Sequence, residues 1–502
     1  MVNLPVVMGI DLGTQSIKVV LVDRDGDIKG IAKRAYPTHY SRYGWMEQNP
    51  RDWWEAMAAC VRDVLMGTGI ASNEVAAIGL SGHMHSLVAV GNDGEVIRPV
   101  IVWADERAGA EAQQITERLG AAALEITYNP IIAAYTAPKL LWLHNHEPET
   151  LENLSLICFP KDYLRWCLTG EWATDPSDAS GSMLYDLSSG SWSTRLCDVV
   201  NINRDKLPPI LPSTEVAGSL RQAAAEELGL KSGIPVVVGA GDLAAALVGA
   251  GIVREGLAVI NIGTAGQVMQ LIDGDLIQYL GKVYLFSHAL PKRIFGLGAV
   301  PSAGLSLSWL RGSIISSGDD VSAISYDDMD QLAGEVSPGC NGLLFLPHLL
   351  GTGTPHLDGN ARGCFVGLTP SHDRAALIRA TMEGVAFALK ENLHLFNIGA
   401  SVNRREVRLT GGSARSAVWR QIIADVTGYP VRTLQCADAS ALGAALLAAV
   451  GVGWLRDTIE ASERVVVMDD VSIPDQEHHM AYEKHFEKYQ AVYQAMTGVW
   501  NA

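Results

Sequence analysis

The stretch MGIDLGTQSIKVVLVD, from Met8 to Asp23, has a near copy in AVINIGTAGQVMQLID, from Ala258 to Asp273. Each copy has an apolar segment, a Gly-Thr turn and a second apolar segment that ends in Asp, which predicts a β-hairpin with a glycine and a hydroxyl at its tip. The two copies lie about half of the 502-residue chain apart, which predicts two related halves. Aligned without a gap, they share Ile10/Ile260, Gly13/Gly263, Thr14/Thr264, Leu21/Leu271 and Asp23/Asp273.

Such turns are candidates for phosphate binding. A glycine turn exposes backbone N–H groups that can hold a phosphate, and a threonine hydroxyl adds a donor. Single Gly-Thr turns between apolar strands are common, but two copies in two halves favour two domains that hold one polyphosphate between them. Asp11 lies two residues before the first turn, where a carboxylate can hold Mg²⁺ against phosphates or simply cap its own turn. Asn261 takes this place in the second copy, so the two halves have different tasks.

Composition limits the class of protein. A chain of 502 residues with 48% hydrophobic and 19% charged residues predicts a globular protein of at least two domains. The net charge of −17 argues against a nucleic-acid partner but allows a nucleotide held by backbone dipoles and a metal. Seven scattered cysteines without C-x-x-C spacing predict no disulfide framework or zinc site and favour the cytoplasm. We expect no signal peptide and no membrane span, because the longest apolar run, Ala441–Leu455, is too short.

Strand-like and helix-like patterns alternate along the chain, which predicts an α/β fold class. We expect the first domain at residues 1–252 and the second at residues 253–502, facing each other across a cleft. Other expected elements are a strand at 76–80 with a hairpin partner and a turn at 91–94, a helix at 108–120, a strand at 236–239 before an Ala-rich helix, a strand at 407–409 and a helix at 416–428.

Asp242 is the second candidate carboxylate. It follows a strand and Gly241 and precedes a helix. It is either a helix N-cap, which Asp often provides, or a general base that takes a proton from an alcohol during attack on a phosphorus. Gly241 would then remove a side chain that blocks approach. Gly411 and Gly412, between a strand and a helix, offer a flat surface for an adenine ring or a phosphate, although such pairs also form plain turns.

Two further segments suit a polar ligand. His83 and His85, at i and i+2, would share one face of a strand without a third metal ligand, so we favour contact of this segment with a polar substrate, or packing. Trp103-Ala104-Asp105-Glu106-Arg107 combines an aromatic ring with both charges. That set suits a polyhydroxylated ligand, or alternatively a surface helix start with local charge pairs.

Taken together, these residues resemble the FGGY carbohydrate kinases, which have two actin-like ATPase (ribonuclease H-like) domains with a cleft between them. The resemblance covers nearly the whole chain, and within the family the G-x-M-H, W-x-D-x-R and A-P-K-L-L-W motifs are most similar to those of xylulose kinases. The matching segments are Met8–Lys18, Gly44–Pro50 with Trp53-Trp54, Ser81–His85, Trp103–Arg107, Ala137–Trp142, Pro160–Tyr163, Gly241-Asp242, Gly263-Thr264, Phe345–Pro347, Thr354–His356 and Gly411–Trp419.

The resemblance implies ATP-dependent phosphorylation of a sugar hydroxyl, by general-base catalysis with in-line transfer, and lobes that close to exclude water. It also allows a homodimer, for which the sequence shows no interface signature. The implied roles are Asp242 as catalytic base that also contacts the sugar, Asp11 as the Mg²⁺-linked carboxylate, Met84, His85, Trp103 and Asp105 on the sugar side, and Thr14, Gly263, Thr264, Gly411 and Gly412 on the ATP side.

Three departures from xylulose kinases bear on the substrate. Leu243 stands where they have an Asn that reaches the sugar, His83 replaces a Gln, and Gly351-Thr352-Gly353-Thr354-Pro355 replaces Gly-Glu-Arg-Thr-Pro. A lost hydrogen bond to a buried hydroxyl costs about 1–3 kcal/mol, enough to change a preference between sugars. We therefore expect phosphorylation of D-xylulose to D-xylulose 5-phosphate, with another ketopentose, a deoxyketose or a polyol as the alternative.

Two other classes of function remain open from the sequence. An actin-like nucleotide switch would have the same hairpins, but it would not need Gly241-Asp242 beside a polar pocket. A member that binds sugar without phosphorylating it is the third interpretation, and the intact Asp11 and Asp242 argue against it.

Overall fold

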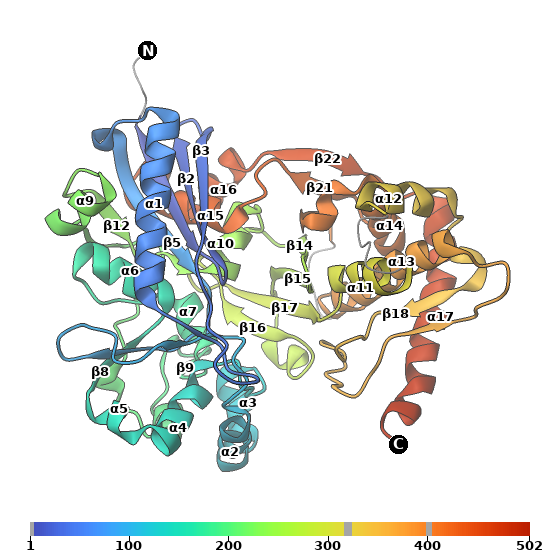
Figure 1. The fold of residues 1–502 in the computed structure, drawn as a ribbon, viewed down its shortest axis with the longest axis horizontal. Coiled ribbons are helices and arrows are strands. Elements are labelled where there is room, and N and C mark those ends of the chain that lie inside the picture. The colour runs from blue at the N-terminus through green and yellow to red at the C-terminus, as the bar shows by residue number, and fades with distance from the viewer. Residues whose placement is uncertain (1–4, 316–323, 398–403) are drawn as a thin grey trace. The chain divides into compact units, whose positions relative to one another are not determined.

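A computed structural model describes residues 5–315, 324–397 and 404–502. The chain forms two compact units, drawn in Figure 1. The first comprises Met1–Val253, Leu285–Phe295 and Asp438–Val466, and the second comprises Arg254–Tyr284, Gly296–Ala437 and Val467–Ala502. The boundary between residues 252 and 253 stays a prediction. In the described part of the chain, no helix has both the length and the apolar character needed to cross a membrane.

The first hairpin is confirmed as part of the sheet of the first unit. β1 (Val6–Leu12) pairs antiparallel with β2 (Ser16–Asp23), which pairs antiparallel with β3 (Ile28–Ala35). On its other side β1 pairs in parallel with β5 (Val75–Gly82). The sheet continues through β12 (Pro235–Val237) to β11 (Val216–Ser219), and β13 (Ala240–Gly241) also pairs with β5.

Two helices pack on opposite faces of this sheet. Because side chains alternate along a strand, Met8 and its cross-strand partner Leu21 share one face, and Gly9 lies on the other. α1 (Pro50–Thr68) covers the Met8 face (Figure 1), and α15 (Ala439–Gly451) covers the Gly9 face. A Cβ at Gly9 would lie 2.1 Å from the carbonyl oxygen of Ala441, so only glycine lets this helix pack so closely. Most residues of α15 are buried, and this helix contains much of the apolar run that begins at Ala441.

The predicted strand at 76–80 is confirmed as part of β5, but its hairpin partner is wrong. β6 (Val88–Gly91) pairs antiparallel with β8 (Leu154–Cys158), not with β5. The turn at 91–94 is present, since the N–H of Gly94 donates to the carbonyl of Gly91. The strand expected at 236–239 is split into β12 and β13, because Gly239 has φ +80° and lies against the backbone of Leu80. The expected helix at 108–120 is α2 (Gly109–Leu119), and the Ala-rich helix is α10 (Asp242–Gly249).

The remaining elements of the first unit form two short strand pairs and several helices around the sheet. They are β4 (Glu47–Gln48), β7 (Val100–Ile101), β9 (Tyr185–Asp186), β10 (Ser191–Trp192), α3 (Ala121–Thr127), α4 (Thr136–His146), α5 (Pro148–Glu152), α6 (Pro160–Thr169), α7 (Pro176–Gly181), α8 (Thr194–Val199), α9 (Gln222–Leu228), α16 (Thr458–Val465), and the 3-10 turns η1 (Ser72–Glu74) and η2 (Arg204–Lys206).

The second hairpin is also confirmed. β14 (Leu257–Ile262) pairs antiparallel with β15 (Gly266–Leu271) and in parallel with β20 (Glu406–Gly411), which lies next to β21 (Val431–Leu434) and then β22 (Met468–Ser472). β16 (Tyr284–Ser287) and β17 (Ile294–Val300) extend the sheet beside β15, and the division between the units falls within both strands.

The gap-free alignment of the two hairpins is wrong beyond their tips. Leu12 pairs with Ile17, but the equivalent Ile262 pairs with Gly266, so the second turn is one residue shorter. The turn hydrogen bonds agree, because Gly13 donates to Ser16 whereas Gly263 donates to Ala265. By register Leu21 is equivalent to Gln270, and the matches Leu21/Leu271 and Asp23/Asp273 are coincidental.

Helices surround the sheet of the second unit. The long α13 (Arg374–Leu395) packs on β18 (Leu344–Leu346), where a Cβ at Gly384 would lie 2.2 Å from the carbonyl oxygen of Phe345. The other elements are β19 (Cys364–Val366), α11 (Gly304–Trp309), the π-helix η4 (Leu310–Ile315), α12 (Tyr326–Glu335), α14 (Ala417–Thr427), α17 (Gln476–Trp500), and the 3-10 turns η3 (Leu276–Tyr279), η5 (Cys340–Gly342) and η6 (Gly412–Arg415).

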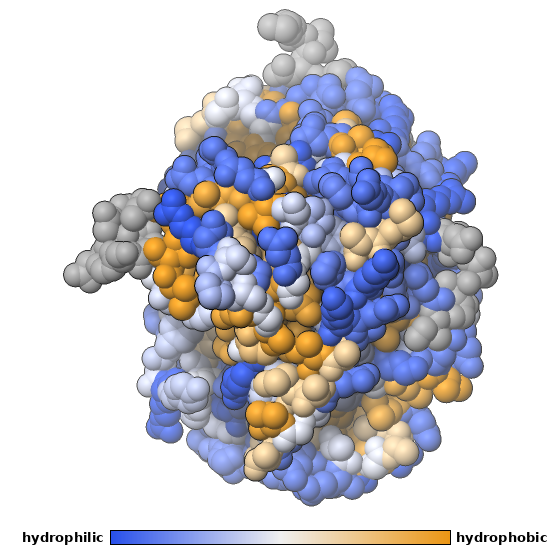
Figure 2. Space-filling view, turned by 90° about the vertical axis from the view of Figure 1, so that its right-hand side faces the viewer, coloured by the Kyte–Doolittle hydropathy of each residue, from blue (hydrophilic) through white to orange (hydrophobic). Residues whose placement is uncertain are grey.

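Apolar side chains are also present on the surface of the second unit. Figure 2 views its side that carries α17 and shows apolar areas interspersed among polar ones. Exposed apolar residues of this unit include Leu350, Leu357, Leu368 and Val499. Scattered residues of this kind are ordinary on globular proteins.

Candidate active site

Asp11 lies near the end of β1 on the α15 face of the sheet, and its neighbours follow from the register. Lys18 and Ser81 are its direct cross-strand partners. The Ser81 hydroxyl donates to Oδ1 of Asp11 at 2.6 Å, and Lys18 Nζ lies 4.0 Å from its Oδ2. Lys18 also forms a 2.8 Å ion pair with Asp438, at the start of α15. Burial raises the pKa of Asp11 above its ordinary value, and Lys18 opposes this rise.

The second unit repeats this arrangement without the charge. Asn261 pairs in parallel with Thr410, as Asp11 does with Ser81. The Thr410 hydroxyl donates to Oδ1 of Asn261 at 3.3 Å. An amide in place of the carboxylate therefore keeps the hydrogen bond and removes the negative charge that attracts a cation, which agrees with different tasks for the two halves.

Asp242 is the first residue of α10, and Gly241 occupies the N-cap position. The N-cap alternative for Asp242 is therefore wrong, although its Oδ1 does accept a hydrogen bond from the N–H of Leu243 at 2.8 Å. The side chain stays partly exposed. Burial, and next the negative charge of Asp11, raise the pKa of Asp242 to about 7. The two carboxylates thus interact, and Asp242 can exchange a proton near neutral pH.

Gly241 brings a sugar-side residue next to the base. Its N–H donates to the Ser177 hydroxyl at 2.9 Å, which fixes the backbone before Asp242. A Cβ at this position would lie 2.7 Å from Cγ of Met84 and 3.2 Å from Oδ1 of Asp178. The glycine is therefore needed for the packing of Met84 beside the start of α10.

His83, Met84 and His85 lie on a bend after β5, so the prediction that the two histidines share one face of a strand is wrong. β5 ends at Gly82, and His85 has φ +68°, in the left-handed region. The His85 ring contacts Tyr135 and Phe286, and its Nδ1 lies 2.6 Å from the carbonyl oxygen of Gly181. Burial lowers the pKa of His85 to about 3, so near neutral pH the ring donates through Nδ1 and keeps Nε2 as an acceptor.

Lys139, from the A-P-K-L-L-W motif, holds the same bend. Its buried ammonium donates to the carbonyl oxygens of His85 at 3.3 Å and Tyr135 at 3.4 Å, and to that of Ala134. Burial lowers the pKa of Lys139 to about 7, and Asp105 opposes this effect. The sequence marked this motif only through the family resemblance, because a lysine three residues into a helix shows no sign of burial.

Asp105 is fully occupied by protein donors. Its Oδ1 accepts from the N–H and Nε of Arg107, and its Oδ2 accepts from Met46 N–H at 2.6 Å and from Arg107 Nη2 at 2.7 Å. Arg107 is in turn held by Glu47 at 2.8 Å and by the ring of Trp45 at 3.7 Å. A carboxylate has about four acceptor positions, so a sugar hydroxyl would have to displace one of these donors.

Trp103 and Thr14, predicted on different sides of the reaction, are in contact. The indole Nε1 donates to the Thr14 hydroxyl at 2.9 Å, and 41% of Trp103 is exposed. The first turn therefore touches a residue predicted to contact the sugar.

The second unit has its own cavity, of about 640 Å³, at the tip of its hairpin. Gly263, Thr264 and Gly412 line it, whereas Gly411 is not a lining residue and pairs with Ile262 at the end of β20. The helix predicted at 416–428 is confirmed as α14, and the 3-10 turn η6 lies between Gly411 and this helix. Sequence reasoning missed the other lining residues, which are Ile262, Gly304, Leu305, Leu307, Ser308, Tyr326, Asp327, Asp330, Ser413, Arg415, Ser416 and Trp419.

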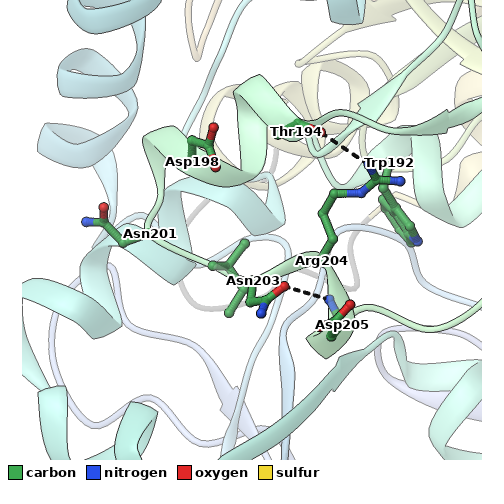
Figure 3. A pocket seen from close by; sticks show the side chains of 8 residues that line it. Trp192, Thr194, Asp198, Asn201, Asn203, Arg204 and Asp205 are labelled. Carbon is green, nitrogen blue, oxygen red and sulfur yellow. Dashed lines mark hydrogen bonds between the residues drawn. The ribbon is translucent and has the colours of Figure 1, made fainter.

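Another cavity, of about 770 Å³, lies on the first unit around α8 and η2 (Figure 3). Its side chains bond to their neighbours: Arg204 donates to Thr194 at 3.2 Å, and the N–H of Asp205 donates to Asn203 at 3.1 Å. None of the predicted site residues lines this cavity, so we assign it no part in the chemistry. The smaller cavity of the second unit is the candidate ligand site, because predicted site residues line it.

Comparisons with known proteins decide the family. Residues 6–249 match the N-terminal domain, and residues 259–452 the C-terminal domain, of the FGGY family of carbohydrate kinases. The chain belongs to this family. It is therefore an ATP-dependent carbohydrate kinase, and the predicted α/β fold class and family are confirmed. A nucleotide switch without sugar transfer does not agree with this result.

Relatives with named substrates are similar over nearly their whole length. The chain is 33% identical to a xylulose kinase of Staphylococcus epidermidis over 97% of this chain and 96% of the relative. It is 29% identical to a gluconokinase of Bacillus subtilis, over 90% and 89%. Among solved FGGY-type structures, a ligand-bound xylulose kinase from Lactobacillus acidophilus has a TM-score of 0.92, 27% identity and 99% coverage of both chains.

Proposed function

We propose that this kinase transfers the γ-phosphoryl group of ATP to D-xylulose, forming D-xylulose 5-phosphate. Relatives from Staphylococcus epidermidis, Bacillus subtilis and Escherichia coli, each 33% identical, are named xylulose kinases. The observation that carries the proposal is the placement of Asp242 at the start of α10, beside the Gly241–Met84 contact and with a pKa of about 7.

Asp242 would act as the general base. A base works best when its pKa is near the operating pH, because it is then largely deprotonated and still binds a proton well. Asp242 would accept the proton of the sugar hydroxyl while that oxygen attacks the γ-phosphorus in line. Burial in the first unit sets this pKa, and the neighbouring carboxylate of Asp11 adds to it.

The sugar would lie against the bend after β5. Met84 would contact its carbon chain, and Nε2 of His85 would accept a hydrogen bond from a hydroxyl. The exposed ring of Trp103 would cover C–H bonds. Asp105 stays a predicted contact, and its four existing hydrogen bonds support a role in holding Arg107 as well.

ATP would bind at the hairpin tip of the second unit. The cavity of the second unit combines glycine surface at Gly412 with the apolar side chains of Leu305 and Leu307, a combination that suits an adenine ring. Asp327 and Asp330 in the same cavity could accept hydrogen bonds from ribose hydroxyls or the adenine amine. In the second unit Gly263, Thr264 and Gly411 would be near the phosphates, and Thr14 of the first unit stays a predicted phosphate contact.

Asp11 is a suitable carboxylate for Mg²⁺. Mg²⁺ typically uses one or two carboxylates together with substrate phosphates and water, so a site made by protein alone is not required. Of the described residues, no three His, Cys, Asp or Glu side chains are grouped to hold a metal. Asp11 supplies hard oxygen donors in a buried position, and a cation would favour the charged form that burial disfavours. When bound, Mg²⁺ would neutralise phosphate charge.

Leu243 favours a second candidate substrate. It is half-buried and directly follows Asp242, at the position where the xylulose kinases that the chain resembles have an Asn that reaches the sugar. A ketose that lacks this hydroxyl, or another ketopentose or polyol, is therefore the alternative. The relative named gluconokinase adds gluconate to the test.

A homodimer and a cytoplasmic location stay predictions from the resemblance and the cysteine pattern.

The test measures ADP release with Mg-ATP across D- and L-ketopentoses, deoxyketoses, pentitols, glycerol and gluconate, for the unaltered protein and for Leu243→Asn. A dominant response to D-xylulose supports the proposal. If D-xylulose is best by a wide margin and Leu243→Asn weakens its use, the idea that Leu243 selects another sugar is wrong. A response to none of these sugars contradicts the proposed substrate class.

A further inference from the structure

One hydrogen bond in the first unit connects the sugar side of the proposed site to its phosphate side. It runs from the indole Nε1–H of Trp103 to the Thr14 hydroxyl, at 2.9 Å, between residues 89 positions apart in sequence. A hydroxyl that accepts this bond must point its own hydrogen elsewhere. The indole therefore restricts the direction in which Thr14 can donate.

The backbone of the first turn is held independently of Trp103. The Tyr36 hydroxyl donates to the carbonyl of Gly13, and Gln48 Nε2 donates to the carbonyl of Thr14 at 2.7 Å. Gln48 is itself fixed by the buried Trp53, whose indole donates to its Oε1 at 3.1 Å. The bond from Trp103 thus acts on a side chain whose backbone is already placed.

The second turn is supported in another way. The carbonyl of Gly263 accepts from the N–H of Gly304, and that of Thr264 accepts from the N–H groups of Ala303 and Leu305. These donors are backbone groups of the second unit's own structure. In the first turn, by contrast, a side chain with a large exposed ring supplies a donor. A ligand that covers the Trp103 ring can therefore act on the first turn, because the same side chain supplies the donor.

We propose that Trp103 is a positioning residue that couples sugar binding to the phosphate turn by orienting the Thr14 hydroxyl. This inference rests on the proposed function, in which the sugar covers the Trp103 ring and Thr14 donates to a phosphate of ATP. A sugar on the ring restricts the indole plane, which holds the Thr14 hydroxyl in its donating direction before ATP arrives. Preorganised donors of this kind stabilise developing charge most effectively. Because coupling between two ligands is reciprocal, the sugar tightens ATP binding and ATP tightens sugar binding by the same factor.

The test is a double-mutant cycle between Trp103→Phe and Thr14→Val. Trp103→Phe keeps an aromatic face and removes the N–H, and Thr14→Val keeps the shape and removes the hydroxyl. We expect Trp103→Phe to lower kcat about 3- to 10-fold, the usual range for one hydrogen bond, with little change in the KM of the sugar. In the Thr14→Val background the same change should have almost no further effect. Thr14→Ser, which restores the hydroxyl, should restore the response to Trp103→Phe.

Equilibrium binding of a non-hydrolysable ATP analogue, measured by calorimetry with and without sugar, is the readout that a merely structural role would not change. Trp103→Phe should abolish the factor by which sugar tightens ATP binding. Trp54→Phe is the matched control, because it removes an indole donor from Glu227 at 2.6 Å on the same unit and should leave this factor intact. Thermal unfolding of each variant verifies that the fold is retained.

The outcomes separate this inference from the proposed function. If the effects of Trp103→Phe and Thr14→Val multiply, or if Trp103→Phe changes only the KM of the sugar, Trp103 does not act through Thr14, whereas the kinase assignment stands. If no sugar stimulates ADP release by the unaltered protein, the proposed function fails. The coupling between sugar and ATP then fails with it, and this outcome is distinct from one in which a sugar stimulates ADP release but the two substitutions act independently.

Discussion

Replacing Asp242 by Asn should remove nearly all phosphoryl transfer and stabilise the protein at the same time. Loss of a general base typically lowers the rate by about 10²- to 10⁴-fold. The amide keeps an oxygen that can accept from the N–H of Leu243, so the start of α10 should be unchanged. Removing the charge relieves both the burial of the carboxylate and its repulsion by Asp11. ATP should bind as before, because Asp242 is proposed to act on the sugar.

The stability gain follows from the raised pKa of Asp242. A shift from 3.8 to about 7 corresponds to about 4 kcal/mol as an upper limit. The side chain is partly exposed and solvent screens it, so we expect about 1–2 kcal/mol. Because the folded state holds this proton more tightly than the unfolded state, the stability contributed by Asp242 falls as the pH rises from about 4 to 7. The advantage of Asp242→Asn should therefore be full at pH 8 and largely gone near pH 4.

The assay combines ADP release at saturating sugar and ATP with urea unfolding at pH 4, 5, 6, 7 and 8. Asp198→Asn, at an exposed position on the first unit, controls for the loss of one negative charge. An Asp242→Asn variant that retains more than a tenth of the activity would show that Asp242 is not the base. A variant less stable than the unaltered protein at pH 8 would refute the argument from burial.

Three further predictions follow from the same geometry. The logarithm of kcat/KM of the unaltered enzyme should rise with unit slope up to about pH 7 and then level off. Lys18→Met should move this levelling to higher pH, because Lys18 lowers the pKa of Asp242. An unchanged pH profile would contradict the interaction between Lys18 and Asp242. Gly241→Ala should raise the KM of the sugar about 10-fold or more, because its Cβ would lie 2.7 Å from Cγ of Met84. If steady-state kinetics give an unchanged KM for the sugar, the contact between Gly241 and Met84 is unimportant. Lys139→Met should lower the thermal midpoint and raise the KM of the sugar more than that of ATP. The reason is that the carbonyls of His85, Ala134 and Tyr135 lose their donor. An equal rise in both KM values would argue against a local effect.

The candidate carboxylates and the two Gly-Thr turns were predictable because the sequence patterns that mark them lie within short stretches of chain. Asp11 and the Gly-Thr turns occupy short, strongly patterned hairpins, and the strand register places Ser81 and Lys18 beside Asp11. Asp242 follows a glycine at the junction of a strand and a helix. The sequence left open whether it caps that helix, and the structure assigns the cap to Gly241.

The sequence by itself determined the α/β class, the duplicated hairpins and the family, since alternating apolar residues, glycine turns and ordered motifs all act within short stretches of chain. Only the tertiary structure decided that Asp105 is occupied by Arg107, that His85 lies on a left-handed bend and that Trp103 reaches Thr14. It also revealed that the second turn is one residue shorter, which a gap-free alignment conceals. These features depend on contacts between residues far apart in sequence, or on backbone angles set by such contacts, and no local pattern encodes them.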